Sequence, residues 1–464
     1  MTHLPTEQIP QTRWARTVDG ACIAYQDLGE GPVTLVVIHG WVSHLEVYWE
    51  QPRYARFLKR LSRNMRVLVF DKRGVGMSDR VNGTPDIGTL ADDVRAVMDA
   101  AGVEKAALLA WGAPGPELAA FFAATHPDRS LCLVTFWSTF HRRKEVDYPW
   151  GLSDQEFEER MATVLPSWGT ECGARAFIKV GYGGLEEPLS PPYNEAEFVA
   201  WNAKLARFAA TPASYEAFER MWHATDARPL LATITVPTGC LYSSLDPEDE
   251  EDVRAEGSAI PTAKFIAVAT TSEVIWVRDP APIVSAIEQF ITSVRHEEAE
   301  LDRMLATVLF TDIVGSTDQA CKVGDACWTE LLEKHNTTVR AFLARYRGNE
   351  VKATGDGFLA TFDGPARAVK CAQAICAAVR PLGLEVRAGC HTGEIELMGA
   401  DVGGIAVHIG ARVAALASPS EVLVSSTVKD LVAGSGLVFE DRGEHKLKGV
   451  PDAWHLYAVA SAAA

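Results

Sequence analysis

The chain has 464 residues, 47% of them hydrophobic, and a formal net charge of −17. This length predicts two or three domains, and the negative charge argues against a nucleic-acid partner. No apolar run approaches the ~18 residues that a membrane span needs. The nine scattered cysteines form no pairing framework or metal spacing, and the N-terminus lacks a signal pattern. We therefore expect a cytoplasmic protein.

Three apolar stretches early in the chain predict strands of one sheet. Residues 33–39 and 106–110 each run into a glycine-containing turn, and residues 67–78 pass from Val-Leu-Val-Phe into Asp-Lys-Arg-Gly-Val-Gly-Met-Ser. Fully apolar strands that alternate with helical stretches indicate a mostly parallel sheet with both faces covered. With these motifs, residues 13–293 resemble the α/β-hydrolase family. The resemblance implies an α/β fold for residues 1–290, with a helical cap at about 137–225.

The chemistry of that family is missing from the matching positions. Its nucleophile lies in Gly-x-Ser-x-Gly, and Gly112 occupies the serine position in Ala-Trp-Gly-Ala-Pro-Gly. The matching acid is Asp246, and Glu273 stands where the histidine belongs. No histidine lies between residues 224 and 295, so the acyl-enzyme route has neither nucleophile nor base.

We therefore expect residues 1–290 to be non-catalytic. Their pocket, lined by Trp41, Trp111 and cap aromatics, would bind a small apolar ligand, or the domain would only scaffold a dimer. After it, residues 282–304 contain no glycine and no proline beyond Pro282. This predicts a continuous helix, with residues 291–303 as a linker that couples the domains stiffly. A solvated spacer is the alternative.

Residues 309–317, Leu-Phe-Thr-Asp-Ile-Val-Gly-Ser-Thr, carry an aspartate at the end of a predicted strand. The carboxylate of Asp312 is a hard oxygen ligand suited to Mg²⁺ or Mn²⁺. The amides around Gly315, Ser316 and Thr317 can approach phosphate oxygens because nothing bulky intervenes. The stretch therefore indicates a metal held over the phosphates of a nucleotide.

Two further clusters follow. Residues 350–362 predict a β-hairpin with Asp356 at its tip and Lys352 on the incoming strand. Residues 401–412 predict a loop at Asp401-Val-Gly-Gly and then a helix that carries His408 and Arg412 one turn apart. Carboxylates for metals and cations for developing charge together suit a two-metal displacement at phosphorus.

With these motifs, residues 304–460 resemble the catalytic domain of class III nucleotidyl cyclases. The resemblance implies an α+β domain over residues 304–464 and two divalent ions, Mg²⁺ or Mn²⁺, at Asp312, Ile313 and Asp356. Lys352 and Asp401 match the pair that reads adenine, because a carboxylate accepts from its exocyclic amine and repels the carbonyl of guanine. Gly315, Ser316 and Thr317 would contact the substrate.

Arg412 matches the arginine that stabilises the pentacoordinate phosphorus, and His408 stands where the family commonly has asparagine. A histidine here predicts activity that titrates near neutral pH. The resemblance also implies a site shared between two chains, and hence a homodimer that converts ATP to cyclic AMP and pyrophosphate. The alternatives are a hydrolase or a ligand-binding protein whose cyclase is weak or silent. The pocket's ligand, the sign of regulation and a guanylate cyclase side reaction stay open.

Overall fold

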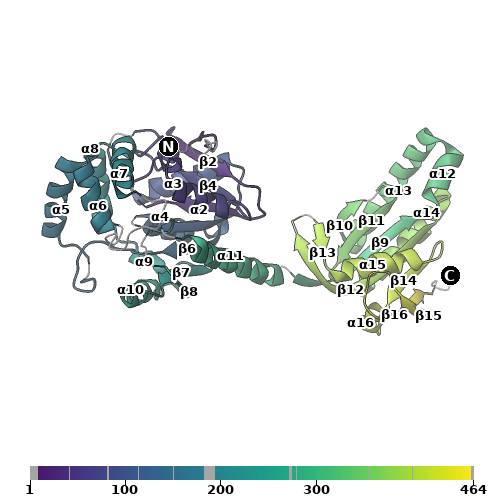
Figure 1. The fold of residues 1–464 in the computed structure, drawn as a ribbon. Helices are drawn as coiled ribbons and strands as arrows, with labels where there is room; N and C mark the ends of the chain where they lie inside the picture. The colour runs from purple at the N-terminus through teal and green to yellow at the C-terminus, as the bar shows by residue number, and fades with distance from the viewer. Residues whose placement is uncertain are drawn as a thin grey trace. The chain divides into compact units, whose positions relative to one another are not determined.

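The structure, a computed structural model, describes residues 9–40, 42–80, 83–112, 114–149, 151–181, 194–270, 274–277, 279–301, 303–353, 355–399 and 401–460. The chain divides into two compact units, Met1–Val294 and Arg295–Ala464. Each unit is built around one eight-stranded sheet (Figure 1). Among these described residues, no helix combines the length and the apolar character needed to cross a membrane.

The first unit contains a mostly parallel sheet with strand order β1-β2-β4-β3-β5-β6-β7-β8. Strands β3 to β8 run parallel, and β1 and β2 pair antiparallel at one edge. Side chains of the central strands are buried on both faces, as a sheet covered by helices requires. The strands are β1 (Arg13–Arg16), β2 (Cys22–Leu28), β3 (Thr34–Ile38), β4 (Arg66–Phe70), β5 (Ala106–Trp111), β6 (Ser130–Phe136), β7 (Thr238–Ser243) and β8 (Ala263–Val268).

Helices between these strands cover the sheet, and a group of four forms a cap. The predicted strands at 33–39 and 106–110 are confirmed as β3 and β5, and the apolar start of the stretch 67–78 is β4, which ends at Phe70. The helices beside the sheet are α1 (Leu45–Trp49), α2 (Pro52–Leu61), α3 (Ile87–Ala100), α4 (Gly115–Thr125), the 3₁₀ turn η1 (Pro127–Arg129), α9 (Arg228–Leu231), α10 (Pro247–Gly257) and α11 (Ala281–Leu301). The cap helices are α5 (Asp154–Ser167), α6 (Glu171–Gly181), α7 (Glu195–Ala209) and α8 (Pro212–Ala224).

Helix α11 runs without interruption across the division between the two units. It begins at Ala281 and ends at Leu301, which agrees with a helix predicted from the absence of glycine and proline. The part of α11 up to Val294 packs into the first unit, with Ile283, Ile287 and Val294 in its core. The domain limits 1–290, 291–303 and 304–464 remain our proposal.

The second unit has a mixed sheet with strand order β10-β11-β9-β12-β14-β16-β15, and β13 pairs with β12. Its two longest strands, β9 and β12, pair antiparallel along their whole length. The strands are β9 (Arg303–Ile313), β10 (Asn349–Ala353), β11 (Gly357–Phe362), β12 (Val386–Met398), β13 (Asp401–Gly403), β14 (Val422–Ser425), β15 (Phe439–Lys446) and β16 (Ala453–Val459).

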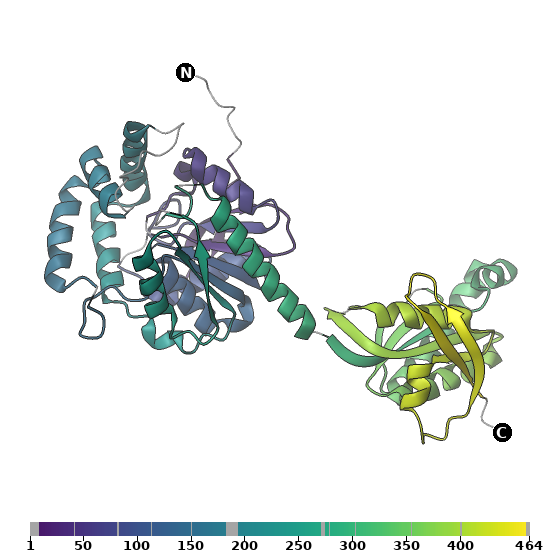
Figure 2. The same ribbon diagram turned by 60° about the horizontal axis from the view of Figure 1, so that its bottom comes forward.

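Helices lie on both faces of this second sheet (Figure 2). Successive side chains of β9 point to opposite faces of the sheet. Leu309 packs in the core with α13 and α14, and Val308 packs toward α15. The result is a three-layer unit whose sheet ends carry the polar residues. The helices are α12 (Ser316–Val323), α13 (Asp325–Tyr346), α14 (Pro365–Val379), the 3₁₀ turn η2 (Arg380–Leu382), α15 (Ile405–Leu416) and α16 (Ser426–Leu431).

Candidate functional site

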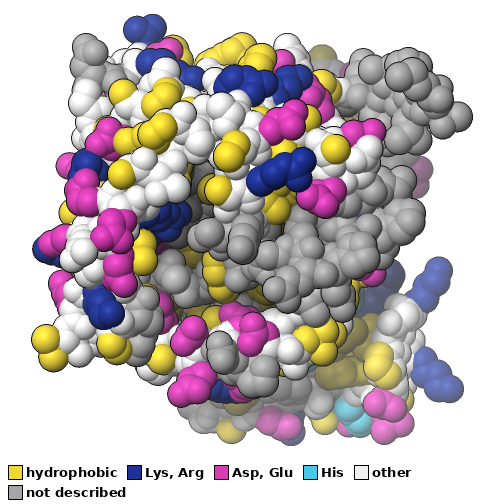
Figure 3. All heavy atoms as spheres, turned by 60° about the vertical axis from the view of Figure 1, so that its left-hand side comes forward, with side chains coloured by type: hydrophobic (Ala, Val, Ile, Leu, Met, Phe, Trp, Pro, Cys, Tyr) yellow, Lys and Arg dark blue, Asp and Glu magenta, His cyan; other side chains and the backbone are white. Residues whose placement is uncertain are grey.

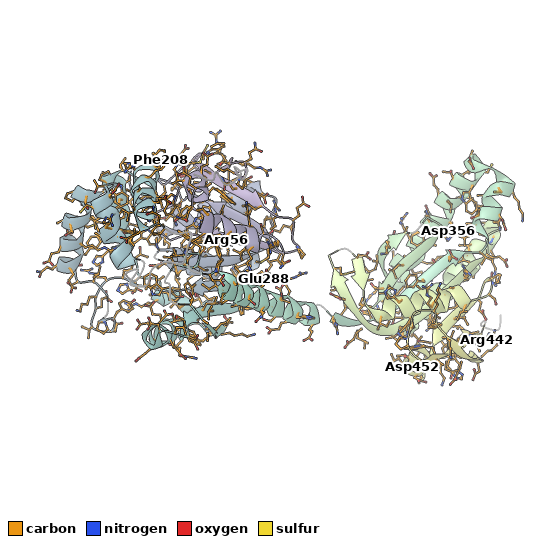
Figure 4. The ribbon with its side chains drawn as sticks, in the orientation of Figure 1. Arg56, Phe208, Glu288, Asp356, Arg442 and Asp452 are labelled. Atoms are coloured by element: carbon orange, nitrogen blue, oxygen red, sulfur yellow. The ribbon has the colours of Figure 1, made fainter. Side chains whose placement is uncertain are left out.

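Two aspartates from distant parts of the chain meet at one end of the second sheet. The antiparallel register of β9 and β11 sets Asp312 opposite Gly357, so Asp356 is its immediate neighbour. The amide of Ile313 donates to the carbonyl oxygen of Asp356 at 3.2 Å, which ties the end of β9 to the β10–β11 turn. The predicted hairpin is confirmed, with Asp356 in its turn (Figure 4).

The segment after Asp312 turns sharply into α12. Gly315 has φ of 62°, in the left-handed region, and caps the helix that begins at Ser316. A Cβ at Gly315 would meet nothing within 4 Å, so the glycine serves the backbone conformation and not a close contact. The amides of Ser316 and Thr317 lie in the first turn of α12, where helix amides lack intrahelical acceptors. This is a suitable place for phosphate oxygens.

Lys352 and Asp401 form a second polar pair. Lys352 Nζ donates to both carboxylate oxygens of Asp401, at 2.9 and 2.7 Å. About half of each side chain is exposed, at 48% and 45%. Hydrogen bonds from Lys352 and from the Val402 amide hold the pKa of the Asp401 carboxyl below its usual range. The expected loop around Asp401 is instead the short strand β13, because Asp401 and Val402 pair with the end of β12.

The predicted helix after Gly404 is confirmed as α15. His408 and Arg412 are both exposed on it and stand four residues apart, on one face. Arg412 Nε donates to the carbonyl oxygen of Lys448 at 3.3 Å. Ile405 and Leu416 extend the same exposed face with apolar side chains, 52% and 46% exposed.

Sequence reasoning missed Arg387, a residue of β12. Its Nε and Nη2 donate to Oδ2 of Asp312 at 2.9 and 2.5 Å, because the two residues are register partners across β9 and β12. The only signal in the sequence is an arginine in the strand Val-Arg-Ala-Gly-Cys, and its partner depends on that register. The ion pair orients the Asp312 carboxylate and leaves Oδ1 clear of it.

The oxygen atoms at Asp312 and Asp356 are suitable ligands for divalent cations. Two carboxylates and backbone oxygens at the end of a strand are the hard ligands that Mg²⁺ and Mn²⁺ prefer. Among the hydrogen bonds and ion pairs of the described residues, none joins this group to Lys352 and Asp401. The described contacts thus define three polar sets in one chain: the carboxylates Asp312 and Asp356, the Lys352–Asp401 pair and the His408–Arg412 face.

The first unit has the strand–turn–helix geometry of a nucleophile elbow between β5 and α4, but no nucleophile stands at its turn. Gly112 follows β5 with φ of 60° and leads into α4, and a Cβ there would approach only Gly40 Cα, at 3.8 Å. The missing serine is thus not explained by lack of space. Asp246 follows β7 and is exposed. Glu273 and Trp41 lie outside the described residues, so their predicted places are not described further.

Comparison with protein families separates the same two parts. A model of the adenylate and guanylate cyclase catalytic domain matches residues 301–461. A model of the α/β-hydrolase fold matches residues 33–170. The cyclase match contains every residue of the three polar sets, and the hydrolase match contains Gly112.

Individual proteins agree with this division. "Putative adenylate cyclase 3" of Rhizobium meliloti is 30% identical over 164 residues, covering 33% of this chain and 28% of its own length. "Putative carbamate hydrolase RutD" of Azorhizobium caulinodans is 31% identical over 218 residues, 46% of this chain and 75% of its own length. The crystal structure of a bromoperoxidase from Bacillus anthracis covers 61% of this chain and 100% of its own, with a TM-score of 0.51 at 19% identity. This last likeness is one of fold.

Proposed function

Because the chain belongs to the α/β-hydrolase fold family in its first unit and carries an adenylate and guanylate cyclase catalytic domain in its second, we propose that it is an adenylate cyclase. It converts ATP to 3′,5′-cyclic AMP and pyrophosphate. The observation that carries the proposal is the β9–β11 register, which brings Asp312 beside Asp356 across more than forty residues of sequence. Two aspartates brought together at the ends of neighbouring strands suit a metal-nucleotide site.

The reaction forms one bond and breaks another at the α-phosphorus. The 3′-hydroxyl oxygen attacks the phosphorus, loses its proton, and pyrophosphate leaves. Two divalent ions held by Asp312, Ile313 and Asp356 would supply charge neutralisation and a more acidic hydroxyl. Amides of Ser316 and Thr317 would hold phosphate oxygens, and the Arg412 guanidinium would donate to the oxygens that gain charge in the transition state.

Arg387 is a positioning residue in this scheme. Its two N–H groups occupy Oδ2 of Asp312, so the carboxylate cannot rotate freely and Oδ1 is kept available. His408 stands one helical turn before Arg412 and is exposed. There it is able to hydrogen-bond the ribose.

Preference for ATP follows from the Lys352–Asp401 pair. The carboxylate of Asp401 accepts from the exocyclic amine of adenine, and Lys352 donates to a ring nitrogen. Guanine presents a carbonyl oxygen where adenine has the amine. The Asp401 carboxylate has no proton to donate to that oxygen and repels its partial negative charge. The ion pair between the two residues holds both in place before a base arrives.

Catalysis by a homodimer is supported by the separation of the three polar sets in one chain. The exposed apolar residues Ile405, Leu416, Leu397 and Met398 offer a surface beside Arg412 and Asp401 for a second copy. In the dimer, Asp312 and Asp356 of one chain would face Lys352, Asp401 and Arg412 of the other. The first unit, with Gly112 in place of a nucleophile, would sense a small ligand and regulate the cyclase.

The test is formation of cyclic AMP from ATP by the purified chain, with Mg²⁺ and with Mn²⁺, beside the variant Asp312→Ala. We expect product from the parent chain and at least a hundredfold less from the variant, since one metal ligand is lost. Asp318→Ala, an exposed aspartate on α12, is the matched control and should keep the parental rate. Absence of product with either metal would contradict the proposal, and turnover of an ester panel would favour the hydrolase alternative.

A further inference from the structure

A cavity in the first unit lies between the sheet and the cap. Its volume is about 230 Å³, roughly one and a half times the ~150 Å³ of an engineered cavity that holds benzene. One substituted ring therefore fits within this volume. The cavity reaches both Gly112 at the end of β5 and the cap helices α5 to α8, so an occupant would contact the two layers together.

The walls of the cavity are aromatic. The aromatic side chains that line it are Tyr48, Trp111, Trp137, Trp168, Phe177 and Trp276. Stacked and edge-to-face contacts with such side chains favour a flat ring by about 0.5–1.5 kcal/mol for each pair. Trp137 also has a φ of 50°, a conformation that costs a bulky residue about 1–3 kcal/mol and that often marks a binding site.

The charged side chains on the wall do not balance. Arg142 and Arg160 line the cavity, and Glu219 is the carboxylate that faces them. Nη2 of Arg142 contacts Oε2 of Glu219 at 3.3 Å, whereas its buried Nη1 has no hydrogen-bond partner among the residues that the structure describes. Among the described lining residues there are thus two arginines and one glutamate, and a buried guanidinium nitrogen without a hydrogen-bond acceptor is costly.

Two other described carboxylates lie near this cluster, Glu117 and Glu256. Glu117 on α4 is fully buried, and neither of its oxygens has a hydrogen-bond partner. Burial raises the pKa of Glu117 to about 8, against the opposing effect of Arg142, so this carboxyl is mostly neutral at pH 7. Glu256 is not among the described residues that line the cavity, and its two oxygens accept from the Phe140 amide at 2.7 Å and from the Tyr148 hydroxyl at 2.5 Å.

We propose that this cavity binds an aromatic monocarboxylate, with the ring between the tryptophans and the carboxylate toward Arg142 and Arg160. The inference rests on the ligand-sensing function proposed above for the first unit and names the ligand class. A neutral hydrocarbon ring would contact the aromatic walls but would offer no acceptor to Nη1 of Arg142. Because Gly112 offers no nucleophile, the ligand is held and not cleaved. The outer face of the cap mixes basic and acidic side chains (Figure 3), so the preference for an anion arises inside the cavity.

The experiment is isothermal titration calorimetry of the full chain with phenylacetate, phenylacetamide and acetate. Phenylacetate and its amide share the ring and differ in charge, and acetate has the charge without the ring. We expect phenylacetate to bind at least tenfold more tightly than either of the others. In Arg160→Gln, the preference for phenylacetate over the amide should fall at least fivefold.

Two further variants complete the test. Arg175→Gln removes an exposed arginine of α6 that pairs with Glu195 outside the cavity, and it should keep the parental preference. Trp168→Phe replaces the indole by a smaller aromatic ring. It should weaken the binding of phenylacetate and of phenylacetamide equally. Arg142→Gln is avoided, because removal of one partner of a buried pair often unfolds the protein.

Equal binding of the amide, or no binding of phenylacetate at 10 mM, would overturn the proposed ligand class. The cyclic AMP rate with and without phenylacetate is measured separately. Binding without any change in that rate would leave the ligand class intact and would reject the regulatory part of the proposed function. The two failures are therefore distinguishable.

Discussion

Single residues at the second unit's site are held by specific partners before any substrate binds. Asp312 is fixed by Arg387, and Asp401 is fixed by Lys352. Each aspartate therefore keeps a defined orientation although its side chain is partly exposed. Because these side chains are already ordered, substrate binding costs less conformational entropy.

At Asp401, charge should decide which base is accepted. Asp401→Asn replaces the carboxylate by an amide of the same size that can donate to the carbonyl of guanine. We expect kcat/KM for ATP, divided by that for GTP, to fall by about tenfold to a hundredfold, as for loss of a charged hydrogen bond. Asp441→Asn, at an exposed aspartate of β15 that pairs with His455, is the control. An unchanged ratio in Asp401→Asn would show that Asp401 does not read the base.

A buried histidine should make the second unit sensitive to acid. His391 lies in β12 with Nδ1 at 2.8 Å from the Ser425 hydroxyl, and burial lowers its pKa from 6.5 to about 4. The unfolded chain binds a proton below pH 6.5, whereas the folded unit does not until about pH 4. The contribution of His391 to the free energy of unfolding is therefore complete above pH 6.5 and is lost as the pH falls toward 4.

Calorimetric melting of the full chain at pH 7.0 and 5.0 measures this loss. We expect the transition of the second unit to shift down on acidification, with up to roughly 3 kcal/mol at stake. His391→Gln should melt lower at pH 7 and shift less between the two pH values. A variant with the same pH shift as the parent would assign the acid sensitivity to other groups.

At the scale of elements, α15 is the helix whose placement matters most for the site. It lies closely on β12 and β9 because glycines stand at the contact. A Cβ at Gly389 would overlap the backbone of Ala414, and one at Gly410 would overlap Val308. The close approach sets the height at which His408 and Arg412 stand above the sheet.

Gly389→Ala should push α15 away from the sheet. We expect a loss of about 1–3 kcal/mol in the free energy of unfolding of the second unit, as for overpacked cores, and a lower cyclic AMP rate. Gly364→Ala is the control, since the nearest atom to its Cβ is Arg367 Nε at 3.5 Å. Melting temperatures of the two variants give the comparison; equal values would mean that the backbone accommodates the methyl group.

At the scale of the whole molecule, the proposed site needs two chains. Asp312→Ala damages the metal side and Arg412→Ala damages the opposite side, so each variant alone should be nearly inactive. A mixed dimer of the two contains one intact site. A random equimolar mixture should therefore recover about a quarter of the parental cyclic AMP rate.

The measurement is the rate of the mixture after equilibration, beside each variant alone at the same total concentration. Recovery that grows with time would follow subunit exchange. A mixture that stays at the background of the single variants would contradict a shared site and would favour one complete within a single chain.

Much of the architecture could be predicted from local patterns. Apolar runs ended by glycine turns located β3, β5 and the β10–β11 hairpin, and the glycines before α15 located that helix. Strand β13 was missed because a three-residue strand exists only through its pairing with β12. Helix α11 was predictable because neither glycine nor proline interrupts it.

Local residue patterns were enough to indicate the two families, the missing nucleophile at Gly112 and the candidate residues of the second unit. These are properties of residue type and local spacing. Only the tertiary structure decided that Arg387 pairs with Asp312, that Lys352 pairs with Asp401, and that two arginines face one glutamate in an aromatic cavity. Such contacts depend on strand register and helix packing between segments far apart in the chain, which no local pattern specifies.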